Sequence, residues 1–166
     1  MIKKVPFYGF FLALALILAF IESLIPIPFG VPGMKLGLSN LMVVILIYIW
    51  SPKEALLLNL CRILLSGFMF GNAFAILYSL GGAALSFLAM WLVFRSGRYT
   101  IATMSILGGL FHNIGQLAVA KAALSGISLF WYAPPLMVCG SITGCLIGLL
   151  ATELLPRLPR FIKVEL

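Results

Sequence analysis

Long apolar runs, broken by short clusters of Pro, Gly and charged residues, divide the chain into six segments of helical length. About 20 apolar residues are enough for a helix to cross the hydrocarbon core of a bilayer. We therefore predict an all-α integral membrane protein with six transmembrane helices in a single domain, 1–166. The approximate helix ranges are 6–25, 36–50, 52–66, 72–94, 100–124 and 134–155. A cluster of small residues in the fourth helix, 81–84, predicts close approach of a neighbouring helix.

The third helix has a clear start signal. Ser51 is placed as the N-cap, Pro52 occupies the first helical position, and Glu54 can complete a capping box. Gly67 is predicted to end this helix, so the second and third helices are each short for a span. A re-entrant hairpin is the alternative, but it would place Lys53 and Glu54 deep in lipid, and we favour two short spans.

The composition agrees with a membrane protein, because 63% of the residues are hydrophobic and only 9% are charged, against roughly 25% in a soluble domain. The net charge of +7 comes from basic residues at the ends of apolar runs. They form no basic stripe interleaved with aromatic residues, so we expect no nucleic-acid partner. With both termini inside, most of the basic residues fall on the inner side, as the positive-inside rule requires. They are Lys3, Lys4, Lys53, Arg95, Arg98, Arg157, Arg160 and Lys163.

Several kinds of catalytic site are excluded by residues that the chain lacks. All four acidic residues are Glu, so no aspartate-rich cluster can hold Mg²⁺ on a diphosphate. No Gly-x-x-x-x-Gly-Lys-Ser/Thr loop is present, so the chain cannot hydrolyse ATP by that route. His112 is the only His, which excludes a His-rich metal site, and a Ser/His/acid hydrolase would have only Glu22 as its carboxylate. We predict no enzymatic activity, no metal and no cofactor.

The polar residues inside the apolar runs converge on the outer half of the predicted bundle. They are Glu22, Asn40, Asn59, Arg62, Asn72, His112, Asn113, Gln116 and Lys121. Polar groups in lipid are costly, so a cluster on one side is typical of a cavity or relay. The alternative is hydrogen bonding between helices, at about 0.6 kcal/mol for each bond.

The Pro/Gly-rich stretch 26–40 joins the first two helices on the same side. Its prolines lack an N–H group and disfavour helical geometry in the residues before them, so this stretch cannot be a regular helix. We predict a lid over a solute site, with Lys35 as its charged contact.

Three basic residues, Lys35, Arg62 and Lys121, oppose Glu22 in this half, which leaves a charge of 3 − 1 = +2. This excess favours an anionic or partly anionic ligand; pairing of Arg62 with Glu22 is the alternative. The predicted substrate-binding residues are Arg62 and Lys121 for anionic groups, His112, Asn113 and Gln116 for hydrogen bonds, Lys35 and Asn40 as loop contacts, and Asn72.

Four motifs resemble the bacterial Gx transporter family, whose members are often labelled heptaprenyl diphosphate synthase component I. They are Ile25-Pro26-Ile27-Pro28 after Glu22, Pro32-Gly33-Met34-Lys35-Leu36-Gly37-Leu38-Ser39-Asn40, Arg62 followed by Gly67, and His112-Asn113-Ile114-Gly115-Gln116. The resemblance covers about residues 10–155 and implies a multi-pass protein of the bacterial cell membrane.

That family is similar to the substrate-capture (S) components of energy-coupling-factor (ECF) transporters. The similarity implies six helices that bind a vitamin-like solute from outside and dock on a transmembrane subunit and ATPases. The docking pattern Ala-x-x-x-Ala is matched by Ala15 and Ala19, although such spacing is also ordinary helix packing. The resemblance thus predicts the capture component of a small-solute uptake system. The runner-up is a non-catalytic membrane subunit of prenyl diphosphate or quinone synthesis, which recruits a soluble synthase through its basic inner face.

Overall fold

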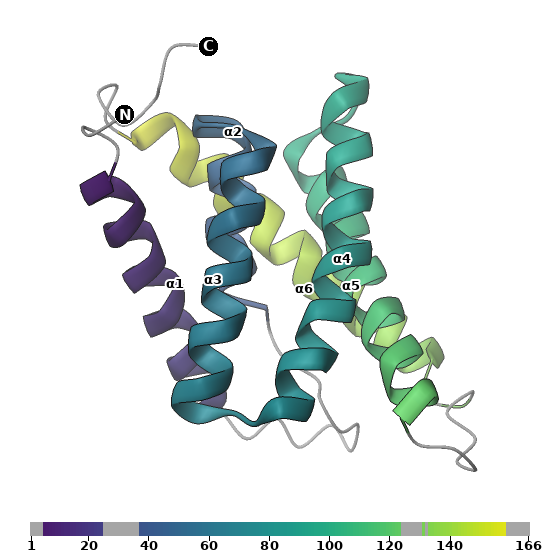
Figure 1. Cartoon of the computed structure of the whole chain (residues 1–166). Coiled ribbons are helices and arrows are strands. Elements are labelled where there is room, and N and C mark those ends of the chain that lie inside the picture. Colours follow the sequence, from purple (N-terminus) through teal and green to yellow (C-terminus); the bar gives the residue numbers. More distant parts are fainter. Residues whose placement is uncertain (1–4, 25–36, 124–130, 132, 159–166) are drawn as a thin grey trace.

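The computed structural model describes residues 5–24, 37–123, 131 and 133–158. These residues form six α-helices and no strand, which confirms the all-α class for the described part of the chain. The helices are α1 (Val5–Leu24), α2 (Asn40–Ile49), α3 (Pro52–Phe70), α4 (Ala73–Ser96), α5 (Ile101–Ala123) and α6 (Ala133–Leu154), followed by the short 3-10 helix η3 (Leu155–Arg157) (Figure 1).

Successive helices alternate in direction (Figure 1). The start of α1, the α2–α3 turn, the α4–α5 turn and the end of α6 therefore lie at one end of the bundle. Exposed basic residues gather there: Lys53, Arg95, Arg98 and Arg157. This arrangement is the one that the predicted topology requires, with the chain entering and leaving the bundle on the same side.

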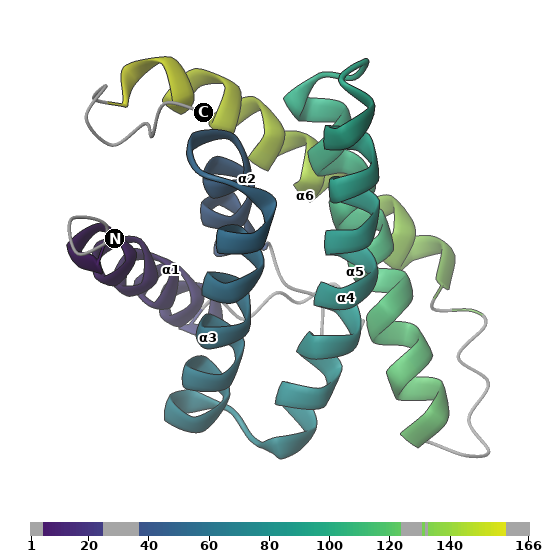
Figure 2. The ribbon, with the colours of Figure 1, turned by 45° about the horizontal axis from the view of Figure 1, so that its top comes forward.

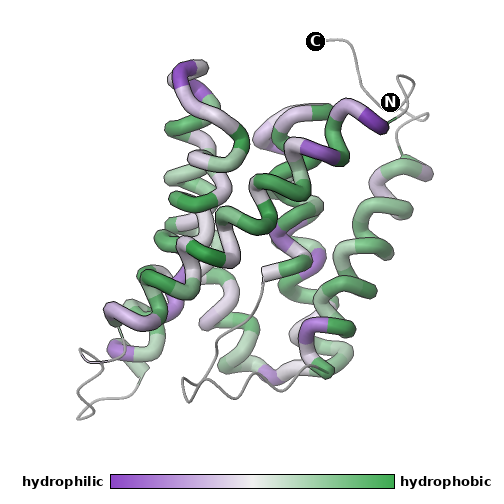
Figure 3. The backbone as a smooth tube through the Cα atoms, turned by 180° about the vertical axis from the view of Figure 1, so that it is seen from behind, coloured by the Kyte–Doolittle hydropathy of each residue, from purple (hydrophilic) through white to green (hydrophobic). Residues whose placement is uncertain are grey.

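Three described helical segments are long and apolar enough to cross a membrane, namely α1, α4 and α6 with η3. Coloured by hydropathy, the helices are largely hydrophobic along their length, and hydrophilic residues are frequent near their ends (Figure 3). These features fit a multi-pass membrane protein. Spanning by all six helices stays a prediction, because α3 and α5 carry the polar residues of the bundle interior.

The second helix differs from its predicted range, 36–50. Gly37, Leu38 and Ser39 are not helical, and α2 contains only 10 residues. At 1.5 Å per residue it is about 15 Å long, half of the hydrocarbon core. All residues from Leu41 to Ile47 are buried. Because a helix that is apolar on every side belongs in a protein interior, α2 owes its composition to burial among the other helices. Its predicted start at residue 36 is wrong for residues 37–39, and its role as a short span stays a prediction.

The start of α3 is as predicted, but its end is not. The Ser51 hydroxyl accepts a hydrogen bond from the Glu54 N–H (3.4 Å) and donates one to the Glu54 carboxylate (2.8 Å). Gly67 does not end the helix, which continues to Phe70. A Cβ atom on Gly67 would overlap the Ile76 side chain of α4. Gly67 therefore serves close packing of α3 on α4 rather than termination.

The bundle has two halves (Figure 2). In the first half, α1–α3, α2 lies in a core of large apolar side chains that includes Phe11, Leu46 and Trp50 and continues to Met104 and Ile147 of the second half. In the second half, α5 makes the most extensive helix contacts of the described chain, with α4 and α6. These contacts involve glycines: a Cβ on Gly115 would overlap the Gly81 carbonyl of α4, and one on Gly144 of α6 would overlap a carbonyl of α5. The predicted close approach at 81–84 is confirmed.

Candidate functional site

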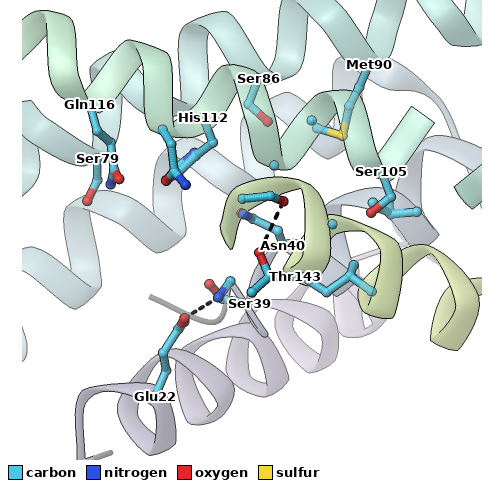
Figure 4. A pocket seen from close by; sticks show the side chains of 18 of the residues that line it. Glu22, Ser39, Asn40, Ser79, Ser86, Met90, Ser105, His112, Gln116 and Thr143 are labelled. Atoms are coloured by element: carbon cyan, nitrogen blue, oxygen red, sulfur yellow. Dashed lines mark hydrogen bonds between the residues drawn. The ribbon is translucent and has the colours of Figure 1, made fainter. Parts of the chain in front are cut away.

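A central cavity of about 50 Å³ lies where the two halves meet, and all six helices line it (Figure 4). The first half contributes Glu22, Ser39, Asn40 and Arg62; the second contributes Ser79, Ser86, Ser105, His112, Asn113, Gln116 and Thr143, together with several glycines. Polar side chains from helices far apart in the sequence thus face one common space.

The size of this cavity limits what it can hold. A bound water needs roughly 10–15 Å³ by this kind of measure, so 50 Å³ accommodates about three to five water-sized groups. Sites for drug-sized ligands measure about 300–1,000 Å³. In this form the cavity fits a carboxylate or a single phosphate, and a whole vitamin-sized solute exceeds it.

Arg62 is the central charged residue of the cavity wall. Its side chain is 8% exposed. The guanidinium donates from Nε (3.1 Å) and Nη2 (2.7 Å) to the carboxamide oxygen of Asn59, one helical turn earlier. It also donates from Nη1 to the Ser39 hydroxyl, at 2.7 Å. Two neutral side chains therefore fix the guanidinium in place without neutralising its charge.

Glu22, near the end of α1, is also buried, and its carboxylate accepts a hydrogen bond from the backbone N–H of Gly37 (Figure 4). Its charge attracts that of Arg62. The two residues differ in their hydrogen-bond partners, since Arg62 binds Ser39 and Asn59 and Glu22 binds the segment before α2. Glu22 therefore anchors this segment, in addition to its electrostatic attraction to Arg62.

On the second half, His112 and Gln116 lie one turn apart on α5 and face the cavity (Figure 4). Gly82 of α4 makes room for them, because an added Cβ would lie 2.8 Å from both the His112 Cε1 and the Gln116 Cγ. Asn113 also lines the cavity, but its amide donates to the Leu136 carbonyl of α6 at 2.6 Å. For Asn113 the alternative of interhelical hydrogen bonding is confirmed.

The structure brings together five of the eight predicted substrate-binding residues: Asn40, Arg62, His112, Asn113 and Gln116. Lys35 lies outside the described residues. Asn72 is exposed and caps α4, its side chain accepting from the Ala75 N–H at 2.8 Å, and Lys121 is exposed near the end of α5. Neither Asn72 nor Lys121 lines the cavity. Of the four charged residues behind the predicted charge of +2, the described lining contains Arg62 and Glu22, so this charge of the outer half stays a prediction.

Several cavity residues were not predicted, namely Ser39, Ser79, Ser86, Ser105 and Thr143. Hydroxyls in apolar helices often donate to the carbonyl one turn before them, as Thr143 does to Gly140 at 3.2 Å. Their presence alone is therefore a weak signal. Ser79 and Ser86 are seven residues apart on α4, a spacing that places both on one helical face.

Ala15 and Ala19, the predicted docking pair on α1, do not form one exposed face. Ala15 is completely buried and belongs to the apolar core of the first half, whereas Ala19 is only partly buried. Ala15 is therefore unavailable to a partner in this conformation. Packing of α1 inside the chain accounts for Ala15, and docking through Ala19 stays a prediction.

Comparison with known proteins identifies a family for this arrangement of helices and motifs. The family model described as heptaprenyl diphosphate synthase component I matches residues 11–154, which is most of the chain. Searches of curated proteins and of solved structures found no match. The predicted family label is confirmed, while the similarity to ECF S components stays a prediction. The chain belongs to the heptaprenyl diphosphate synthase component I family.

Proposed function

We propose that this chain is a membrane-embedded substrate-capture protein that binds a small, partly anionic solute in the central cavity. The observation that carries the proposal is Arg62, a buried cation on the cavity wall that two neutral side chains hold in place. Burial of a charge is costly unless partners compensate for it. Glu22 attracts the buried charge of Arg62, and a negatively charged group bound beside Arg62 would add to that compensation.

The geometry of the guanidinium suits this role. Arginine has five N–H donors, and Arg62 directs three of them to Asn59 and Ser39. In the described part of the chain, this leaves two donors for other partners. The planar fork of arginine matches carboxylate and phosphate oxygens, and His112 and Gln116 supply neutral hydrogen-bonding groups across the cavity.

Capture of a whole solute requires more space than the cavity has in this form. Enlarging the cavity requires movement of α1–α3 relative to α4–α6, which pack on each other less extensively than α5 packs on α4 and α6. We place the chain in the bacterial cell membrane with six spans and both termini inside. ECF-type transmembrane and ATPase subunits would drive release of the solute inward, because this sequence carries no Walker A loop.

Native mass spectrometry of gently extracted protein tests this function. We expect wild-type protein to retain a small molecule with a carboxylate or phosphate group, and Arg62→Gln to lose it. Arg98→Gln is the matched control, because Arg98 is exposed at the α4–α5 turn. Equal retention by both variants would contradict the assignment of Arg62.

A second function is favoured by the family description, which names a component of a synthase. The exposed basic residues at the end of the bundle with the α2–α3 and α4–α5 turns could recruit an acidic surface of a soluble synthase. Co-purification from native membranes separates the two functions. Energy-coupling ATPases as partners support solute uptake, and a prenyl synthase as partner supports the synthase role.

A further inference from the structure

An apolar groove of about 400 Å³ lies on the outer face of α6, directly beside the central cavity. Leu146, Leu149 and Leu150 of α6 form much of it, with Leu38 from the segment before α2. These leucines on α6 are between 48% and 56% exposed, so the groove opens toward the surroundings of the bundle. In a membrane those surroundings are acyl chains.

The groove and the central cavity share two lining residues, Thr143 and Ile147. Leu38 lies between Gly37 and Ser39, which both line the cavity. Gly37 has φ +73°, and a Cβ built on it would lie 3.4 Å from the Ile147 Cδ1. A single layer of side chains, which includes Thr143 and Ile147, therefore separates the central cavity from the groove. Gly37 adds no side chain to this wall.

We propose that the ligand is a single-chain amphiphile whose small anionic head binds at Arg62 and whose apolar chain lies in the groove. This inference rests on the proposed function, since it assumes an anionic group in the cavity. The cavity has room for only a few heavy atoms, so the rest of any larger ligand must lie elsewhere. The groove is the adjoining space, and its lining is almost wholly apolar.

The charged residues of the cavity and of the groove indicate which end of the ligand lies in which space. The far end of the groove carries Glu153, which is exposed and pairs with Arg157 at 3.2 Å. Arg157 therefore already has an acidic partner at that end, whereas in the described part of the chain Arg62 keeps two donors for an anionic head in the cavity. The space in the cavity limits the head to a carboxylate or a single phosphate; a diphosphate, with two such groups in series, exceeds that space.

The position of the ligand's apolar chain tests this inference better than the affinity of the ligand does. Lipid tails are as apolar as leucine side chains, so transfer of the chain from bilayer to groove contributes little binding free energy. Substitutions of groove residues are therefore expected to shift the ligand's apolar chain and to change the affinity of the ligand little. A label at the end of the chain reports this directly.

The experiment uses the full chain in nanodiscs of zwitterionic lipid and two probes, dodecyl phosphate and dodecanoate, each with a photoreactive diazirine at the chain end. After illumination and digestion, we expect labelling of the α6 segment 146–150 several-fold above that of other lipid-facing helices. Leu150→Trp fills the groove and is expected to reduce this labelling several-fold. Ile142→Trp is the matched control, because Ile142 is 55% exposed on the same helix but does not line the groove.

Three outcomes decide the inference. Concentrated labelling by either anionic probe, reduced by Leu150→Trp and not by Ile142→Trp, supports it. Even labelling of all lipid-facing helices, or equal labelling by the neutral dodecanol analogue, overturns it. The proposed function would still be supported if binding of butyl phosphate, an anion with a short chain, depends on Arg62. If Arg62→Gln changes neither butyl phosphate binding nor labelling, the proposed function fails as well.

Discussion

The two halves of the bundle are packed by opposite means. In α1–α3, large side chains such as Leu46 and Trp50 fill the interior around a central helix. In α4–α6, glycines such as Gly115 and Gly144 bring helix backbones into direct contact. A core of large side chains depends on filled volume, whereas backbone contact depends on the absence of side chains.

The halves also differ in the chemistry that they bring to the central cavity. Both charged residues of the described lining, Glu22 and Arg62, come from the first half. The second half supplies neutral groups, including His112 and Gln116. The cavity therefore joins a charged face to a hydrogen-bonding face where the two halves meet.

The largest expected effect on stability comes from removing volume in the first half. Leu46→Ala deletes part of a side chain that is 0% exposed and leaves a cavity, so the free energy of unfolding should fall by about 2–5 kcal/mol. Unfolding in mixed detergent micelles measures this loss. Leu57→Ala is the control, because Leu57 of α3 is 59% exposed, and its change should stay within about 0.5 kcal/mol. Equal losses in the two variants would show that the first half is not packed around α2.

Adding volume to the second half should have a somewhat smaller effect. In Gly144→Ala the new methyl group would overlap the Ser105 carbonyl and lie 2.9 Å from the Ile106 Cα. Backbone atoms cannot turn aside as a flexible side chain can, so we expect a loss of about 1–3 kcal/mol in the same assay. Gly9→Ala is the matched control, since a Cβ on Gly9 meets no atom within 4 Å. If both variants keep wild-type stability, α5 and α6 do not pack through glycine.

The smallest expected effect comes from the hydrogen bond between α5 and α6. Asn113→Ala removes the donor to the Leu136 carbonyl, and hydrogen bonds between membrane helices average about 0.6 kcal/mol. The same unfolding assay should show a loss of that order. A loss greater than that of Gly144→Ala would mean that hydrogen bonding, and not glycine packing, holds the second half together.

The pattern of the sequence predicted the helices well where burial and lipid exposure demand the same composition. It left the role of α2 open, because an apolar helix inside a bundle and a short span look alike in sequence. The prediction for Gly67 failed for a similar reason. The sequence does not distinguish a glycine that ends a helix from a glycine that leaves room for a neighbouring side chain such as Ile76.

The same limit applies to the candidate site. Arg62, His112 and Gln116 were predictable, because polar residues in apolar helices are rare and their depth follows from the topology. Lys121 and Asn72 belong to the same predicted outer half but lie exposed near helix ends, outside the cavity, because an assignment to one half of the bundle does not specify what a residue faces. Ser86 and Ser105 were missed because hydroxyls in helices commonly bond their own backbone.

The most direct test of the central claim is calorimetric titration of the full chain in nanodiscs with butyl phosphate, for wild type, Arg62→Gln, Arg62→Lys and Arg98→Gln. A hydrogen bond to a charged group contributes about 1.5–3 kcal/mol, so binding should weaken at least about tenfold in Arg62→Gln. Arg62→Lys, which keeps the charge without the fork, should be intermediate, and Arg98→Gln should match wild type. Equal affinity in all four proteins, each verified as folded by its unfolding transition, would contradict an anion site at Arg62.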